Sequence, residues 1–181
     1  MTRSDTPPDT RNGTDSGTAA RTDARTDAGG DQGPNQGPRG ALASMTTCHA
    51  TTVAIDGRAV LIRGASGSGK SGLALRLIAL GAGLVADDRT CLWVEGGRIM
   101  ADAPAPIRGR IEARGVGLLY CPATGPSPLA LIVDLDRAEP DRLPPERHED
   151  VMGVSLPVIG KSDHAHFPEA IALYLRYGRS D

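Results

Sequence analysis

Aromatic residues are scarce in this chain of 181 residues, which contains one Trp, one Phe and three Tyr. Proteins that bind single-stranded nucleic acid stack bases on aromatic side chains, and many nucleic-acid binders carry a clear basic excess. Here 20 Lys and Arg stand against 22 Asp and Glu, which gives a formal net charge of −2. The composition therefore predicts no nucleic-acid partner.

The sequence also lacks an apolar run long enough to cross a bilayer, and its beginning lacks the basic-then-apolar order of a secretion signal. Its cysteines, Cys48, Cys91 and Cys121, are widely spaced and form no C-x-x-C pair. Neither a disulfide framework nor a zinc knuckle is indicated. We expect a cytoplasmic protein with no membrane contact.

Residues 1–44 consist mainly of Thr, Asp, Arg, Gly, Pro, Gln and Ser, and Leu42 is their one large apolar residue near the end. Such a composition cannot bury a core, so this segment is predicted to be a disordered low-complexity tail. The remaining residues 45–181 have the length of one domain. We predict that they form one folded domain.

The most informative stretch meets every position of the phosphate-binding pattern G-x-x-x-x-G-K-[ST]. An apolar run at residues 59–62 predicts a buried strand before it, and an apolar segment from Leu73 to Leu80 predicts a helix after it. A plain Gly/Ser turn has no use for Lys and Ser directly after its last glycine. The pattern comprises Gly64, Ala65, Ser66, Gly67, Ser68, Gly69, Lys70 and Ser71.

Each residue type in this loop has a chemical reason. The glycines allow backbone N–H groups to turn toward anionic oxygens, and the start of the following helix adds its dipole. Lys70 is then expected to contact the phosphates and Ser71 to help bind Mg²⁺. The sequence predicts binding of a nucleoside triphosphate or a close polyphosphate relative.

The order of the predicted elements favours a mixed sheet. Residues 51–55 and 58–62 flank Asp56-Gly57, a strong hairpin signal, and residues 90–94 and 98–101 predict a second hairpin. Further strands are expected at residues 84–86 and 129–135, and a terminal helix at residues 167–177. Two hairpins around one central helix argue against a doubly wound α/β fold.

Two adjacent carboxylates, Asp87 and Asp88, follow the strand predicted at residues 84–86. Beside a phosphate loop, carboxylates bind metal or accept a proton, and a pair can divide these tasks. A polar turn at the end of a strand is the plainer interpretation. Residues 131–136 compete for the metal, because this apolar run ends in Asp134 and Asp136 and has the form of a Walker B strand.

Other polar residues are ambiguous when taken alone. Glu112 is suited to complete a metal site or to bind a positive neighbour, and Arg114 to contact phosphate. His49 precedes the first hairpin, where a single histidine is typical of a surface or capping position.

Together, these segments resemble the catalytic domain of HPr kinase/phosphorylase over about residues 46–160. The resemblance is carried by His49 and by residues 64–71, 84–89, 112–117 and 141–143. The A-D-D pattern at residues 86–88 and the E-x-R-G-x-G pattern at residues 112–117 follow the phosphate loop in the sequence. With them, the resemblance is far more specific than it would be from the loop alone. It implies an α/β P-loop domain whose mixed, hairpin-rich sheet surrounds a central helix and is similar to PEP carboxykinase, and it implies a hexamer.

The resemblance implies a nucleotide site in which residues 64–71 bind ATP. Within that site, Lys70 contacts the phosphates, and Ser71 and Glu112 bind Mg²⁺. The implied enzyme is an HPr(Ser) kinase, a protein-serine phosphotransferase of the phosphotransferase system, with an HPr-like phosphocarrier protein as its substrate.

The resemblance also implies the catalytic groups. Asp87 matches the general base that takes the proton from a serine hydroxyl of HPr, and Asp88 supports it through charge and metal. His49 and Arg142 match the remaining active-site His and Arg of the family.

Two departures separate this chain from the bifunctional members of that family. Those members carry an amino-terminal domain where this sequence has its tail, and residues 157–162 do not match their basic P-G-R-N-like stretch. The chain is similar to the short, alphaproteobacterial type, which implies kinase activity and leaves reverse phosphorolysis open.

Two alternative functions remain: a small-molecule kinase, and a P-loop regulator that binds nucleotide without catalysis. A GTPase is disfavoured because the sequence has no N-K-x-D motif for reading the base.

Overall fold

The computed structural model describes residues 45–180, so the tail predicted at residues 1–44 lies outside the described residues. Residues 45–180 form eleven strands and two α-helices. In chain order these are β1 (Thr46–Cys48), β2 (Ala50–Ile55), β3 (Arg58–Arg63), α1 (Lys70–Ala79), β4 (Gly83–Ala86), β5 (Thr90–Glu95), β6 (Arg98–Asp102), β7 (Arg110–Ala113), β8 (Gly117–Tyr120), β9 (Ser127–Ala138), β10 (His148–Val151), β11 (Val154–Lys161) and α2 (Phe167–Tyr177).

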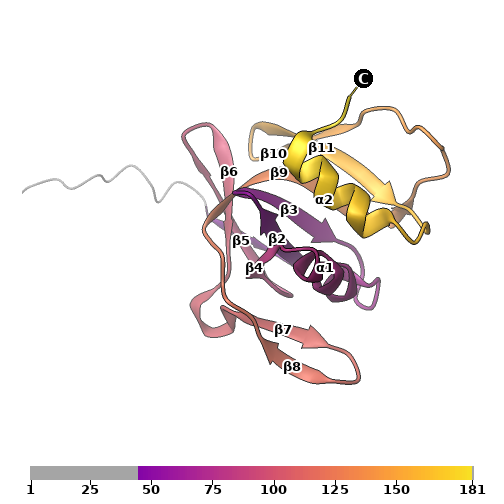
Figure 1. Cartoon of the computed structure of the whole chain (residues 1–181). Coiled ribbons are helices and arrows are strands. Elements are labelled where there is room, and N and C mark those ends of the chain that lie inside the picture. The colour runs from indigo at the N-terminus through magenta and orange to yellow at the C-terminus, as the bar shows by residue number, and fades with distance from the viewer. Residues whose placement is uncertain (1–44, 181) are drawn as a thin grey trace, which may run out of the picture. The chain divides into compact units, whose positions relative to one another are not determined.

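The main sheet is mixed, as the sequence predicts. Its strands follow the order β1-β5-β6-β9-β3-β2-β4, and β11, with β10 on its other side, also pairs with β9. The long strand β9 runs parallel to β3 and β11 and antiparallel to β6. Figure 1 shows β9 passing beside β3 toward the end of the sheet where the loop before α1 lies.

Both predicted hairpins are confirmed. β2 and β3 pair antiparallel with Ile55 opposite Arg58, and the turn residues Asp56 and Gly57 have φ values of 49° and 75°. A two-residue turn with positive φ at both positions matches the twist of the strands it joins. The strand that enters the glycine-rich loop is therefore braced by its sequence neighbour.

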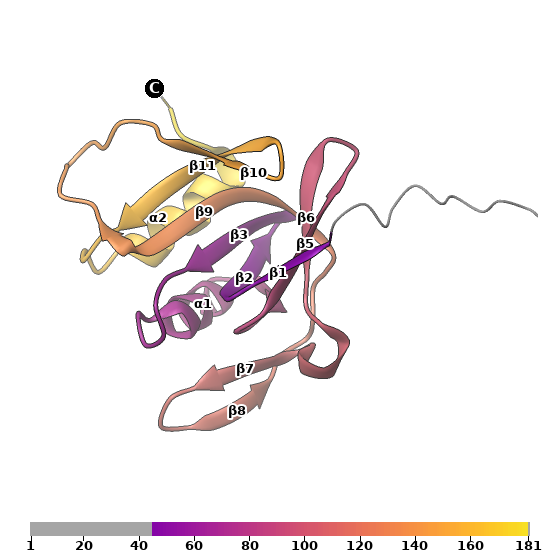
Figure 2. The same cartoon turned by 180° about the vertical axis from the view of Figure 1, so that it is seen from behind.

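The main sheet buries apolar side chains on both faces. On one face, the two helices cover alternate residues of the central strands, and their buried side chains include Leu73 and Leu77 of α1 with Ile171 and Leu175 of α2. The intervening strand residues, such as Leu61 and Ile132, pack with residues of β5 and β6. Figure 2, seen from behind, has both helices on the far side of the strands.

Neither α1 nor α2, the two α-helices of residues 45–180, has the length and apolar character of a membrane-spanning segment.

β7 and β8 form a two-stranded sheet of their own, drawn apart from the main strands in both views. The sequence predicts no regular element for residues 107–120. β8 is exposed throughout, including Leu118 and Tyr120, so it lacks the buried alternation that identifies a strand from sequence. β7 alternates, with Ile111 and Ala113 buried, but over only four residues. β1, β10 and β11 are likewise absent from the predicted elements.

An ion-paired cluster joins three strands, β3, β9 and β10. Arg63, the last residue of β3, donates to both carboxylate oxygens of Glu149 in β10 at 2.6 and 2.7 Å. It also donates to Asp134 Oδ2 of β9 at 2.9 and 3.2 Å. The Arg63 guanidinium holds the pKa of Glu149 below its ordinary value, chiefly through this hydrogen bonding.

This ion pair should make the stability of the fold depend on pH. Because the folded pKa of Glu149 is lowered, the pair stabilises the fold above an unfolded carboxyl pKa of about 4.3. That stabilisation is lost as the pH falls through the lower folded value. Glu149→Gln removes the titrating group, so its unfolding free energy should fall less steeply than that of the native chain over this acidic range.

Urea unfolding at a series of acidic pH values measures this difference. Asp163→Asn is the matched control, because Asp163 is paired with Lys161 at 3.3 Å but its side chain is 91% exposed. The control should follow the native curve. Equal pH slopes for the native chain and Glu149→Gln would contradict the prediction.

Candidate active site

The loop between β3 and α1 has the geometry that its glycines allow. Gly64, Gly67 and Gly69 have φ values of 149°, 82° and 102°, all unfavourable for other residues. The Lys70 side chain folds back over the loop, and its Nζ donates to the carbonyl oxygens of Gly64 and Ala65 at 2.9 and 3.0 Å. The loop is thus closed by its own lysine.

Asp87 lies directly after β4 and is the most highly connected carboxylate of the site. Its Oδ1 accepts hydrogen bonds from Ser71 Oγ and Thr51 Oγ1, each at 2.8 Å. Its Oδ2 accepts from the Glu112 backbone N–H at 3.0 Å. The residue is 8% exposed, so this one carboxylate joins α1, β2 and β7 around it.

Asp88 points the other way. Its backbone is in the left-handed region, with a φ of 63°, and its carboxylate lies 3.0 Å from Nε2 of His49. The two side chains are 71% and 51% exposed. The pair Asp87-Asp88 therefore consists of one buried and one solvent-facing carboxylate.

A cavity of about 490 Å³ lies between these elements; Asp88, His49 and Lys70 line it, and the buried Asp87 does not. Its walls come from the glycine-rich loop, the start of α1, the residues after β4 and the β7–β8 hairpin. The lining residues are His49, Thr51, Ser66, Gly67, Gly69, Lys70, Ser71, Gly72, Leu75, Asp88, Glu112, Ala113, Arg114 and Val116.

The other predicted residues lie elsewhere. Arg142 is exposed in the segment between β9 and β10 and does not line this cavity. Asp134 is engaged by Arg63, and Asp136 accepts the backbone N–H of Ala65 at the start of the loop. Of the two carboxylate candidates for the metal, the structure therefore joins Asp87 to Ser71.

One contact of the site was not predicted. Thr51 stands in the strand expected at residues 51–55, and its hydroxyl is buried against Asp87. The available signal in the sequence was the pair of threonines, Thr51 and Thr52, at the start of an apolar strand. This signal does not show which residue the hydroxyl of Thr51 contacts. Among residues 45–180, no group of three or more His, Cys, Asp or Glu side chains is placed to hold a metal ion.

Several known proteins of one family resemble this chain in sequence. The family described as the HPr Serine kinase C-terminal domain matches residues 40–124. An HPr kinase/phosphorylase of Lactococcus lactis subsp. lactis is 46% identical over 79 residues, which are 43% of this chain and 26% of that protein. One from Acidovorax sp. is 41% identical over 126 residues, which are 62% of this chain and 40% of that protein. The chain thus spans less than half the length of these relatives.

A solved structure resembles the fold over a longer stretch. The Hpr(Ser) kinase/phosphatase from Coxiella burnetii superposes with a TM-score of 0.62 and 28% sequence identity. The match covers 72% of this chain and 94% of that one. In sequence and in fold, this chain is therefore similar to the catalytic domain of the HPr kinase/phosphorylase family.

Proposed function

We propose that this protein is an ATP-dependent protein-serine kinase that phosphorylates a serine of an HPr-like phosphocarrier protein. The observation that carries the proposal is the contact between Ser71 Oγ and Asp87 Oδ1 at 2.8 Å. It joins the end of the glycine-rich loop to the carboxylate pair, at a cavity that Glu112 and His49 also line. A pair of carboxylates can divide metal binding and proton transfer, whereas a nucleotide binder without catalysis needs only the first of these tasks.

Residues 64–71 are proposed to bind the phosphates of ATP through their N–H groups and through Lys70. Ser71 and Glu112 are proposed to hold Mg²⁺, and they fit it, because a hydroxyl and a carboxylate are hard oxygen donors on the same cavity. Mg²⁺ commonly takes one or two protein ligands and completes its shell with phosphate and water. When bound, it would neutralise charge on the phosphates.

In the transfer, the serine oxygen of the carrier forms a bond to the γ-phosphorus, and the bond from that phosphorus to the β–γ bridging oxygen breaks. ADP leaves with that oxygen, and the serine proton passes to an aspartate of the site. By its match to the family, Asp87 is the proposed acceptor. Exposure to the cavity favours its neighbour Asp88 as the second candidate, because a substrate hydroxyl reaches a solvent-facing carboxylate more easily.

Several finer properties follow from the same proposal. Residues 45–181 would form the kinase domain, with a sheet similar to that of PEP carboxykinase, and the chains would assemble as hexamers in the cytoplasm. His49, beside Asp88, is proposed to orient that carboxylate. Arg142 would contribute to phosphate binding only when its segment or another chain brings it to the cavity.

The direct test is transfer of label from γ-labelled ATP, with Mg²⁺, to purified HPr from the same organism. The full chain should label a serine of HPr, and Lys70→Met should abolish the labelling, because the lysine charge stabilises the transferred group. Binding of ATP without transfer to HPr would instead favour the nucleotide-binding regulator. Transfer to a small metabolite would favour the small-molecule kinase.

A further inference from the structure

The peptide group between Gly64 and Ala65 lies between two opposite charges. Its carbonyl oxygen accepts a hydrogen bond from Lys70 Nζ at 2.9 Å. Its N–H donates to the two carboxylate oxygens of Asp136 at 2.9 and 3.0 Å. The peptide dipole thus has its positive end on the carboxylate and its negative end on the ammonium, so each contact strengthens the other.

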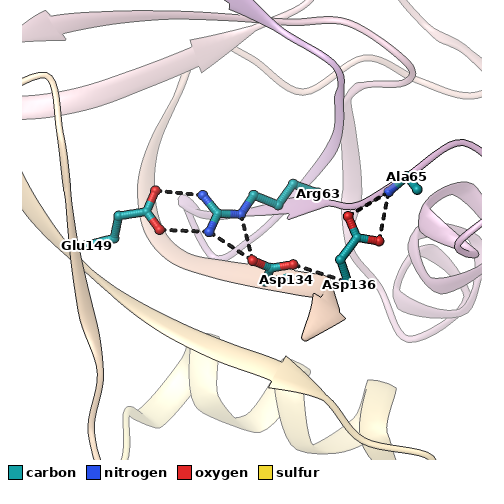
Figure 3. Close-up of polar contacts among 5 residues, drawn as sticks. All are labelled: Arg63, Ala65, Asp134, Asp136 and Glu149. Atoms are coloured by element: carbon teal, nitrogen blue, oxygen red, sulfur yellow. Dashed lines mark hydrogen bonds and ion pairs between the residues drawn. The ribbon is translucent and has the colours of Figure 1, made fainter. Parts of the chain in front are cut away.

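Asp136 is itself oriented by its neighbours (Figure 3). Its backbone N–H donates to Asp134 Oδ1 at 3.0 Å. The other oxygen of Asp134 accepts from Arg63, which is bound through two further hydrogen bonds to Glu149. Arg63 is the last residue of β3 and directly precedes Gly64. Its ion pairs therefore connect β3 to β9 and β10 at the point where the loop begins.

Space around the same peptide group is limited. A Cβ on Gly64 would lie 2.7 Å from Ser68 Oγ, 3.1 Å from Leu135 Cβ and 3.2 Å from Asp136 Oδ1. The loop entry is therefore packed against β9 on the side of Asp136. Asp136 is absent from the cavity that Ser71 and Glu112 line, and both its oxygens engage the loop, which fits a structural task better than metal binding.

We propose that Asp136 is a positioning residue for Lys70 and acts through the Gly64–Ala65 peptide group. With the N–H of Ala65 bound by Asp136, the Gly64 carbonyl faces Lys70 and keeps the ammonium over the loop. Without the carboxylate, this peptide plane is free to rotate, and Lys70 loses one of its two anchors. The inference deepens the proposed function and rests on it, because the task of Lys70 is to bind phosphate.

The sign of the effect on ATP binding distinguishes positioning from simple electrostatics. A carboxylate beside a phosphate site repels the nucleotide, so a purely electrostatic role predicts that Asp136→Ala binds ATP more tightly. Positioning predicts weaker binding, with a Kd raised about tenfold for the loss of a charge-assisted contact. Asp136→Asn keeps an acceptor oxygen without the charge, and should stay within about threefold of the native Kd.

The experiment measures ATP affinity of the full chain by calorimetry, and the Ala65 amide and Lys70 ammonium by heteronuclear NMR without nucleotide. In Asp136→Ala, the amide should exchange faster and the ammonium signal should shift or broaden. Asp150→Ala is the matched control, since Asp150 also accepts a backbone N–H, that of Gly153 at 3.0 Å in another turn. It should leave both loop signals and the Kd unchanged.

Unchanged Lys70 signals or an unchanged or lower Kd in Asp136→Ala would overturn the proposal. If this variant does not fold, Asp136→Ser tests the same point, because its single short hydroxyl cannot replace two carboxylate oxygens. Failure of the proposed function looks different. In that case the native chain does not bind ATP, while the NMR signals still report whether Asp136 orients the peptide group.

Discussion

Asp87→Asn is expected to lower phosphate transfer to the carrier protein by about 10²–10⁴-fold, the usual contribution of a general base. Asn keeps the size of the side chain and an oxygen that can accept from Ser71 and Thr51, the two hydroxyls now bound to Asp87 Oδ1. Its NH2 group then faces the Glu112 N–H, and that one hydrogen bond is lost. Asn cannot take up a proton. If Asp87 is the base, kcat falls far more than the Kd for ATP with Mg²⁺ rises, because the change in Kd reflects only the disturbed contact with Glu112.

Asp88→Asn is the companion variant that assigns the proton acceptor. Should Asp88 carry that role, its replacement lowers kcat alone. Asp87→Asn should then change kcat and the Kd of ATP by similar, small factors, because it only disturbs the link between Ser71 and the Glu112 backbone, the proposed metal-binding residues. The comparison therefore rests on which variant separates kcat from the Kd of ATP.

Single-turnover transfer and calorimetry of ATP binding give these two quantities for each variant. Asp56→Asn serves as the control, since it makes the same chemical change in the β2–β3 turn, where Asn before Gly is equally suited to positive φ. It should transfer phosphate at the native rate. Native rates in both Asp87→Asn and Asp88→Asn would remove the carboxylate pair from the mechanism.

Local signals account for the parts of the fold that the sequence predicted. Asp56-Gly57 determines a hairpin by itself, because few other residue pairs adopt its two positive φ values. The helix predicted at residues 167–177 matches α2 in full, since its apolar spacing and its start and stop lie within one short segment. The helix after the glycine-rich loop was predictable for the same reason.

Long-range pairing accounts for much of what was missed. β11 alternates buried and partly exposed residues, with Leu156 and Val158 buried, but Pro157 inside it argues against a strand. Only its parallel pairing with β9 shows that it completes the sheet. β7 and β8 pair only with each other among the strands of residues 45–180, and the four alternating residues of β7 are too few to identify a strand next to the fully exposed β8.

The candidate site shows the same division. Residue types predicted the loop, Lys70, Ser71 and the carboxylate pair, because each has a chemical task that few residues perform. They could not predict that Asp87 is buried with Thr51 while Asp88 faces solvent beside His49. That difference depends on which way each side chain points at the end of β4, which the fold alone determines.

Gly64→Ala is expected to disrupt the loop itself. A Cβ at this position would meet Ser68 Oγ at 2.7 Å and Leu135 Cβ at 3.1 Å, and the φ of 149° is unfavourable for Ala. The Ser68 hydroxyl can rotate away, but Leu135 Cβ is held by β9. The loop entry must therefore shift, and with it the carbonyl that anchors Lys70.

We expect the Kd for ATP to rise at least about tenfold, which about 1.4 kcal/mol of local crowding and strain would produce. Gly57→Ala separates crowding from backbone strain, because Gly57 also has positive φ but a Cβ added there would meet nothing within 4 Å. This control should lower the unfolding free energy by about 1 kcal/mol and bind ATP normally. Calorimetry and urea unfolding of both variants measure the two effects, and native ATP affinity in Gly64→Ala would mean that the observed loop geometry is not the one that binds phosphate.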